Sequence, residues 1–168
     1  MTDRAGQVES RSRLLMLASE FPPGPGGIGT HAHQLVVGLR RRGWEVRVLT
    51  NQDYASDGEV MAFNAAQAFE IVRLRRVAGP AVEAIYRGLA LARNLRAFRP
   101  NVLVASGSRS VMVAAARGAG RAIPLVAIGH GTEFGGGSGW QSKAVRWAFR
   151  RAAAVVSVSE FTRAQMLR

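Results

Sequence analysis

The part of this sequence best suited to chemistry is a glycine-rich stretch near its start. The stretch FPPGPGGIGTH covers residues 21–31, and Gly24, Gly26 and Gly29 satisfy the spacing G-x-G-x-x-G. Glycines leave backbone N–H groups open to an anion, and the N-terminal end of a helix adds a favourable dipole. The stretch therefore predicts phosphate binding, with a turn that only requires positive φ as the alternative.

The surroundings of this loop argue against a dinucleotide ligand. A dinucleotide fingerprint places its first glycine in a tight turn directly after a strand, whereas EFPP stands in between here. The second predicted strand ends at Thr50 and Asn51 rather than at an acidic residue that would bind a ribose hydroxyl. We therefore reject an NAD-linked oxidoreductase and expect Gly26, Gly27 and Gly29 to bind the phosphates of another ligand.

The elements that must position the loop alternate along the chain. Apolar runs predict strands over residues 13–19, 44–50, 69–75, 101–106, 124–130 and 154–159. Helical spacing predicts helices over residues 30–42, 80–98, 110–118 and 140–151, with a further helix from Glu160. A polar loop is expected over residues 51–59. Strands that alternate with helices indicate a doubly wound parallel sheet, which is a Rossmann-like α/β sandwich of three layers.

Three helix ends carry recognisable signals. Pro80 is suited to the first position of the helix over residues 80–98, and Pro100 stops it. Ser159 is a typical N-cap for the last helix. The long helix places several apolar residues on one face, namely Val82, Ile85, Leu89, Ala92 and Leu95.

Composition narrows the classes of protein to which this chain can belong. The chain has 168 residues, no cysteine and a formal net charge of +12. The absence of cysteine excludes disulfides and cysteine-based metal sites or nucleophiles. The charge suits a surface that meets phosphates, anionic lipid or nucleic acid, or else a surface of solvated arginines. Residues 1–13 have no apolar region of a signal peptide, and no apolar run is long enough to cross a bilayer.

The domain organisation expected is simple. Residues 1–12 are expected to form a disordered leader, and residues 13–168 a single domain. The sequence ends inside its last predicted helix without a stop signal such as glycine. We therefore expect the chain to be part of a longer protein.

Three segments together resemble the N-terminal domain of a GT-B glycosyltransferase of family 4, a family that includes glycogen synthases and mannosyltransferases. They are FPPGPGGIGTHAHQLVVGLRRRGWEVRVLT, IGHGTEF and AAAVVSVSEFTRAQMLR, and the resemblance spans residues 14–168. It implies two Rossmann-like domains that face a cleft, of which this one binds mainly the acceptor. The C-terminal domain, absent here, would hold a UDP- or GDP-sugar. Such enzymes retain the sugar's configuration, usually without a bound metal or other cofactor, and the lack of a D-x-D motif agrees with this.

The resemblance also implies roles for particular residues. Gly26, Gly27 and Gly29 match the loop that approaches the donor phosphates. His130 matches a catalytic histidine near the transferred sugar, where an imidazole can hydrogen-bond a sugar hydroxyl or the departing charge. Weaker candidates for contacts with acceptor or sugar are His31, Thr132, Glu133 and Arg109. The glycine-rich stretch over residues 133–140 is a candidate lid that orders with the acceptor or the second domain.

The sequence thus predicts the acceptor half of a retaining, metal-independent glycosyltransferase that builds a glycan or glycolipid in the cytoplasm. Basic helices suggest peripheral contact with anionic lipid on the cytoplasmic face of a membrane. The alternatives are a polyanion- or nucleic-acid-binding module and a non-catalytic partner subunit. Against nucleic acid, no recognition motif is present, and no aromatic residues interleave with the basic clusters.

Overall fold

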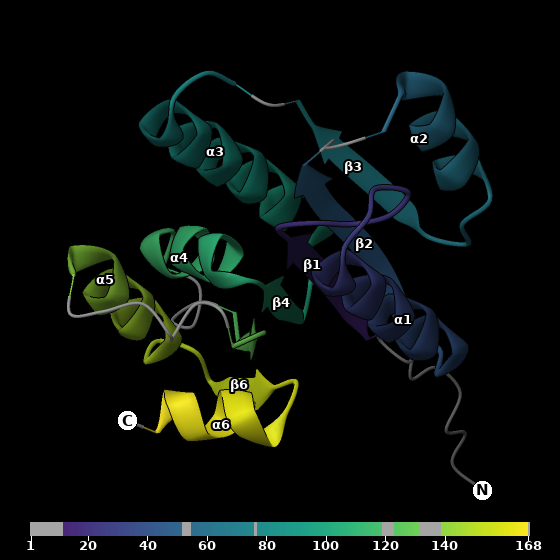
Figure 1. Ribbon diagram of the computed structural model, residues 1–168. Helices are drawn as coiled ribbons and strands as arrows, with labels where there is room; N and C mark the ends of the chain where they lie inside the picture. The colour runs from purple at the N-terminus through teal and green to yellow at the C-terminus, as the bar shows by residue number, and fades with distance from the viewer. Residues whose placement is uncertain (1–11, 52–54, 76, 119–122, 132–138, 168) are drawn as a thin grey trace, which may run out of the picture.

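The computed structural model describes residues 12–51, 55–75, 77–118, 123–131 and 139–167. These residues build one parallel sheet whose strands lie in the order β3-β2-β1-β4-β5-β6. Helices cover both faces of this sheet, so the domain has three layers (Figure 1). The predicted Rossmann-like α/β fold is therefore confirmed.

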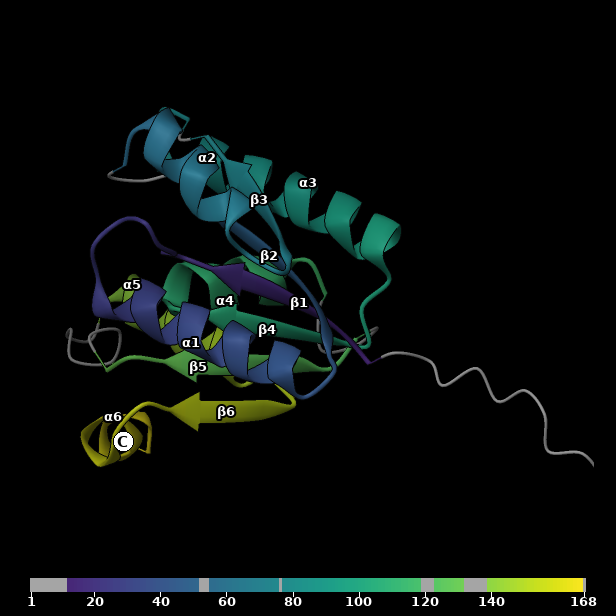
Figure 2. The same cartoon turned by 90° about the vertical axis from the view of Figure 1, so that its right-hand side faces the viewer.

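The elements alternate along the chain as predicted. The strands are β1 (Arg13–Ala18), β2 (Glu45–Asn51), β3 (Glu70–Leu74), β4 (Val102–Ser106), β5 (Leu125–Gly129) and β6 (Ala154–Ser157). The helices are α1 (Gly27–Arg41), α2 (Asp57–Ala65), α3 (Pro80–Phe98), α4 (Ser108–Ala116), α5 (Trp140–Phe149) and α6 (Glu160–Met166). Because the strands are parallel, their carboxyl ends share one edge of the sheet, toward which the arrows in Figure 2 point. We call this edge the carboxyl edge.

Two apolar cores, one on each face, hold the helices to the sheet. Successive side chains of a strand point to opposite faces. Leu14 and Met16 of β1 accordingly lie in the core beneath α1, while Leu15 and Leu17 lie in the core beneath α3, α4 and α5. Strand β1 is therefore buried on both sides, as expected for a central strand of a parallel sheet.

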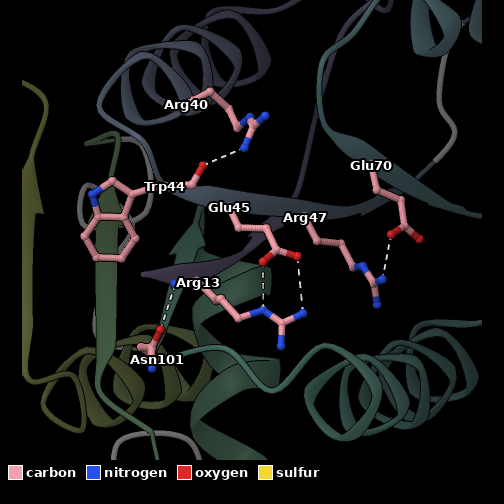
Figure 3. A network of polar contacts seen from close by, with 7 residues as sticks. All are labelled: Arg13, Arg40, Trp44, Glu45, Arg47, Glu70 and Asn101. Atoms are coloured by element: carbon pink, nitrogen blue, oxygen red, sulfur yellow. Dashed lines mark hydrogen bonds and ion pairs between the residues drawn. The ribbon is translucent and has the colours of Figure 1, made fainter. Parts of the chain in front are cut away.

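Ion pairs join the strands at the opposite edge, where they begin (Figure 3). Arg13 Nε lies 3.1 Å from Glu45 Oε2, and Arg47 Nη2 lies 2.6 Å from Glu70 Oε2. The guanidinium carbons of Arg13 and Arg47 also lie 4.4 and 4.7 Å from the centroid of the Phe98 ring. Phe98, the last residue of α3, thereby connects this helix to the beginnings of β1 and β2.

Two predictions of local structure were wrong. Part of the predicted loop over residues 51–59 belongs to α2, which Ser56 and Glu59 begin with a capping box. The Ser56 side chain and backbone donate hydrogen bonds to Glu59, and these bonds lower the pKa of that carboxyl. Helix α1 begins at Gly27 rather than at Thr30, so Gly27 and Gly29 lie in its first turn.

Helix α3 has the predicted bounds, but most of its apolar stripe faces away from the core. Val82, Ile85 and Leu89 are exposed. The buried residues of α3 are instead Arg87, Gly88, Leu91, Asn94 and Phe98. The helix packs through a face that includes polar residues, because partners for these residues are available on the sheet and on α4. Among the described ranges, no helix combines the length and apolarity needed to cross a membrane.

We expect Phe98→Ala to lower the free energy of unfolding by about 3–5 kcal/mol, because it removes a buried ring and the surface on which two guanidinium groups lie. The matched change Phe161→Ala, at a ring that is 69% exposed, should cost about 0.5 kcal/mol or less. Urea denaturation followed by circular dichroism measures both. Equal losses would show that Phe98 does not anchor α3.

Candidate functional site

The centre of the carboxyl edge lies between β1 and β4, where the winding of the chain changes direction. Helix α1 leaves β1 toward one face of the sheet, and α4 leaves β4 toward the other. In open α/β sheets a crevice forms at such a point, and ligands bind there. Here Ser19 N donates to Ser106 O at 3.1 Å, and Ser19 Oγ lies 3.0 Å from Ser110 Oγ. These bonds extend the pairing of β1 and β4 beyond the strands themselves.

Gly27 is the member of the glycine loop with free space in front of it. It is exposed, and a Cβ built on it would have no atom within 4 Å. Thr30 N makes the first bond of the helical pattern, donating to Gly26 O at 3.1 Å. A helix leaves its first N–H groups without helical partners, and the first turn of α1 contains no acidic residue. This end of α1 is therefore suited to an anion.

Gly26 and Gly29 have structural reasons to lack a side chain. Gly26 has φ of 135°, and a Cβ there would lie 2.5 Å from Glu20 Oε2. A Cβ on the buried Gly29 would lie 3.1 Å from Phe21 N and 3.2 Å from Phe21 Cα. The three glycines thus differ: Gly26 forms the turn, Gly29 lets α1 pack against the preceding loop, and Gly27 faces open space.

Arg73 of β3 holds the loop between β1 and α1 in place. Its guanidinium donates to Phe21 O at 3.3 Å, to Pro22 O, and to Asn64 Oδ1 at 3.0 Å. Burial lowers the pKa of Arg73, although the ordinary pKa of arginine is high enough that the side chain stays charged. The structure thus uses this half-buried arginine as a hydrogen-bond donor to the loop.

An aromatic cluster supports the same loop from α1 and α2. The Phe21 ring packs edge-on against His33, Phe63 and Phe69, with centroid distances of 5.7, 6.3 and 6.3 Å. His33 Nε2 lies 2.9 Å from Gln67 Oε1. His33 therefore belongs to the support of the loop, and it does not lie with the other two histidines.

His31 and His130 meet at the carboxyl edge although they are far apart in sequence. Their ring centroids are 5.4 Å apart, with the rings nearly perpendicular. His130 Nε2 lies 3.0 Å from the hydroxyl of the buried Ser106, while His31 Nδ1 is buried without a hydrogen-bond partner. The structure thus brings together two of the predicted site residues and adds Ser106, which fixes one ring nitrogen of His130.

The turn after His130 is fixed by α6. Gly131 has φ of 98°, and a Cβ built on it would lie 2.7 Å from Thr162 Oγ1. Thr162 N in turn donates to Ser159 Oγ at 3.1 Å, which confirms Ser159 as the predicted N-cap. Thr132, Glu133 and most of the candidate lid lie outside the described residues.

Arg109, a candidate contact of the acceptor or sugar, lies at the same edge as His130. It is exposed on the first turn of α4, which follows β4 after the single residue Gly107. Gly107 N donates to Ile128 O at 3.2 Å, which joins the end of β4 to that of β5. The N-terminal ends of α1 and α4 thus both open at the carboxyl edge.

Sequence reasoning missed a buried arginine beneath this edge. Arg87 of α3 is 3% exposed, and its Nη2 donates to Ser110 Oγ at 3.1 Å and to Ala18 O at 3.4 Å. Its Nη1 lies 3.8 Å from Glu83 Oε1, which also accepts a hydrogen bond from Asn51 at 3.0 Å. The i,i+4 pair of Glu83 and Arg87, off the apolar stripe, was the available signal. These contacts link the ends of β1 and β2 to α4.

Metal-ligating side chains do not gather in this region. Within residues 12–51, 55–75, 77–118, 123–131 and 139–167, no group of three or more histidines and acidic residues could hold a metal ion. The polar groups at the centre of the carboxyl edge include the N–H groups of the glycine loop, His31, His130 and the exposed Arg109, with the carboxylate of Glu20 beside Gly26. Such groups bind anions and hydroxyls.

Solved structures share this architecture. UDP-GlcNAc 2-epimerase from Methanocaldococcus jannaschii is similar with a TM-score of 0.68 and 10% identity, over 93% of this chain and 42% of that chain. MurG from Acinetobacter baumannii gives a TM-score of 0.58 and 16% identity, over 89% of this chain and 42% of that chain. LpCGTa, solved with UDP, gives 0.58 and 13%, over 93% of this chain and 49% of that chain. At such identities the likeness concerns the fold alone.

This chain spans less than half the length of each of these three proteins. No curated protein matches it in sequence. The family model of Glycosyltransferase Family 4, however, matches residues 25–168, which include α1, the His130 turn and α6. Family match and fold agree with the resemblance seen in the three sequence segments. The chain therefore belongs to Glycosyltransferase Family 4 and has the fold of an N-terminal GT-B domain.

Proposed function

We propose that this domain is the acceptor side of a retaining glycosyltransferase that uses a nucleotide-sugar and no bound metal. A second domain would hold the donor across the carboxyl edge. The observation that carries the proposal is the meeting of an open helix end at Gly27 with the pair His31 and His130. Family membership supports transfer of a sugar, and retention of configuration comes from the family resemblance.

The glycine loop has the properties needed to stabilise the leaving group. As the bond between the anomeric carbon and the diphosphate breaks, negative charge grows on the phosphate oxygens. Preorganised N–H groups at the N-terminal end of α1 stabilise such charge without moving. Arg73 and the aromatic cluster hold the loop before the ligand arrives. UDP is the favoured nucleotide over GDP, since LpCGTa was solved with UDP.

His130 is suited to contact the transferred sugar. Its imidazole lies at the end of β5, beside the N-terminal turn of α1 that carries His31. The Ser106 hydroxyl occupies one ring nitrogen and restricts rotation of the ring. His130 can then hydrogen-bond a sugar hydroxyl or the developing charge, with Ser106 as a positioning residue. Arg109 and His31 would contact the acceptor.

Substitution of Gly27, with Gly29 as the control, gives a direct test of phosphate binding. In the two-domain enzyme, Gly27→Ala should leave the melting temperature nearly unchanged, because its Cβ meets open space. It should raise the KM for the nucleotide-sugar about tenfold or more, since a methyl group stands where the phosphates approach. Steady-state kinetics with UDP-glucose and UDP-GlcNAc, next to thermal melts, measure both effects.

Gly29→Ala is the matched control for that test. Its Cβ would press on the backbone of Phe21, so the melting temperature should fall whether or not phosphate binds here. A Gly27→Ala enzyme with unchanged KM would contradict phosphate binding by the open end of α1.

The histidine and its positioning serine form a second test. His130→Ala should lower kcat about 100-fold or more if the imidazole acts in the transition state. Ser106→Ala should lower kcat by a smaller factor and shift its pH profile, because the ring remains but loses a fixed partner. UDP affinity, measured by calorimetry, should stay unchanged in both variants. Normal kcat in His130→Ala would remove this residue from the mechanism.

The 168-residue chain alone should not transfer sugar, because half of the proposed site lies elsewhere.

A further inference from the structure

A carboxylate stands beside the loop proposed to bind phosphate. Glu20 lies two residues after the end of β1, and its Oε2 is 2.5 Å from the position that a Cβ on Gly26 would take. A Cβ on Gly29 would lie 3.3 Å from the carbonyl carbon of Glu20. The first turn of α1 therefore packs on the backbone of Glu20, while the side chain of Glu20 reaches Gly26, the residue that precedes the helix.

Glu20 differs from other carboxylates of the fold because the protein gives it no partner. Arginines pair with Glu45, Glu70, Glu83 and Glu160. Within the described part of the chain, by contrast, no hydrogen bond or ion pair involves the side chain of Glu20, which is half-buried. Charged groups removed from water are normally paired. An unpaired carboxylate at the carboxyl edge is therefore available to a ligand.

The position of this carboxylate conflicts with phosphate binding unless a hydrogen-bond donor lies between the two charges. Gly26, which Glu20 touches, is the neighbour of Gly27, where the proposed function places the donor phosphates. Like charges a few ångströms apart repel each other, and partial burial reduces the screening by water. Because the described fold supplies no cation to Glu20, the missing donor has to come from a ligand.

Retention of configuration brings the acceptor to this place. The acceptor oxygen takes the face of the sugar that the phosphate oxygen leaves, so the reacting hydroxyl approaches beside the phosphates. The bond from the acceptor oxygen to the anomeric carbon forms, the bond from that carbon to the phosphate oxygen breaks, and the hydroxyl proton passes to the departing phosphate. A hydroxyl has one proton to donate. The reacting hydroxyl therefore cannot also serve Glu20, and a second hydroxyl is needed.

We propose that Glu20 selects an acceptor with two neighbouring hydroxyl groups, of which one receives the sugar and the other donates a hydrogen bond to this carboxylate. This inference rests on the proposed function and narrows its acceptor to a polyol, such as a sugar ring or a cyclitol, without a negative charge beside the reacting hydroxyl. Hydrogen bonds from hydroxyls to carboxylates are stronger than those between neutral groups. Glu20 is thus a specificity-determining residue that takes no part in proton transfer.

Removal of the charge gives the first test. In the two-domain enzyme, Glu20→Gln should leave the melting temperature nearly unchanged, because no partner is lost. It should lower the Kd for the nucleoside diphosphate about threefold or more, because the repulsion between carboxylate and phosphate disappears. Calorimetry with UDP and with GDP at 0.15 M salt, where the Debye length is about 8 Å, measures this change.

Glu70→Gln is the matched control for that measurement. It removes the same charge from the beginning of β3, at the opposite edge of the sheet, so the Kd for UDP should not change. A residue that only supported the loop would give the opposite result at position 20, because its loss would weaken UDP binding.

The coupling between acceptor and nucleotide gives the second test. Methyl α-D-mannopyranoside, which has neighbouring hydroxyl groups, should lower the Kd for UDP about threefold or more in the unaltered enzyme, because its hydroxyls separate the two charges. Cyclohexanol, which has a single hydroxyl, should not do so. In Glu20→Gln, the Kd for UDP should be the same with and without the mannoside.

Four outcomes would overturn the assignment of Glu20. They are an unchanged or raised Kd for UDP in Glu20→Gln, an equal change in Glu70→Gln, no coupling with the mannoside in the unaltered enzyme, and coupling that persists in Glu20→Gln. Failure of the proposed function has a different signature. An enzyme that binds neither UDP nor GDP, or whose Kd for UDP is unaffected by Gly27→Ala, would contradict the phosphate site itself.

Discussion

The pairing of β1 with β4 is the constraint on which the candidate site depends. These strands are neighbours although α1, β2, α2, β3 and α3 separate them in sequence. Their bonds continue past the strands, from Ser19 to Ser106 and Ser110, and Arg87 joins Ala18 to Ser110 from below. Because the helices that follow β1 and β4 leave toward opposite faces, their N-terminal ends open at one edge without blocking each other.

Much of this arrangement was predictable, because burial on both faces makes each central strand a short apolar run. The runs at residues 13–19 and 124–130 located β1 and β5, and in a parallel sheet this places the glycine loop and His130 at the carboxyl ends of two strands. The contact of His31 with His130 was not predictable, since it depends on where α1 begins. Helix α2 was missed because it lacks an apolar stripe, although Ser56 and Glu59 formed a capping-box signal.

The orientation of α3 shows why the spacing of its apolar residues did not predict which face of the helix is buried. Apolar spacing indicates that a helix has two faces, but the energy of packing decides which one is buried. Arg87 and Asn94 reach partners on the sheet and on α4, and Leu91 and Phe98 fill the core between them. Burial of a charged residue is acceptable only when such partners exist, and they come from distant parts of the chain. The sequence of α3 could not reveal them by itself.

The arginines of this chain have different roles in the structure. Arg13, Arg47, Arg73 and Arg87 have partners within the fold, so a large formal charge does not by itself describe a polyanion-binding surface. Arg93 and Arg96 differ because they are exposed on the one face of α3 that is otherwise apolar. The buried face of α3 carries the polar contacts with the end of β1 and with α4, which leaves Val82, Ile85 and Leu89 to face outward. Support of the site and the exposed apolar side of α3 are therefore two consequences of the same choice of buried side.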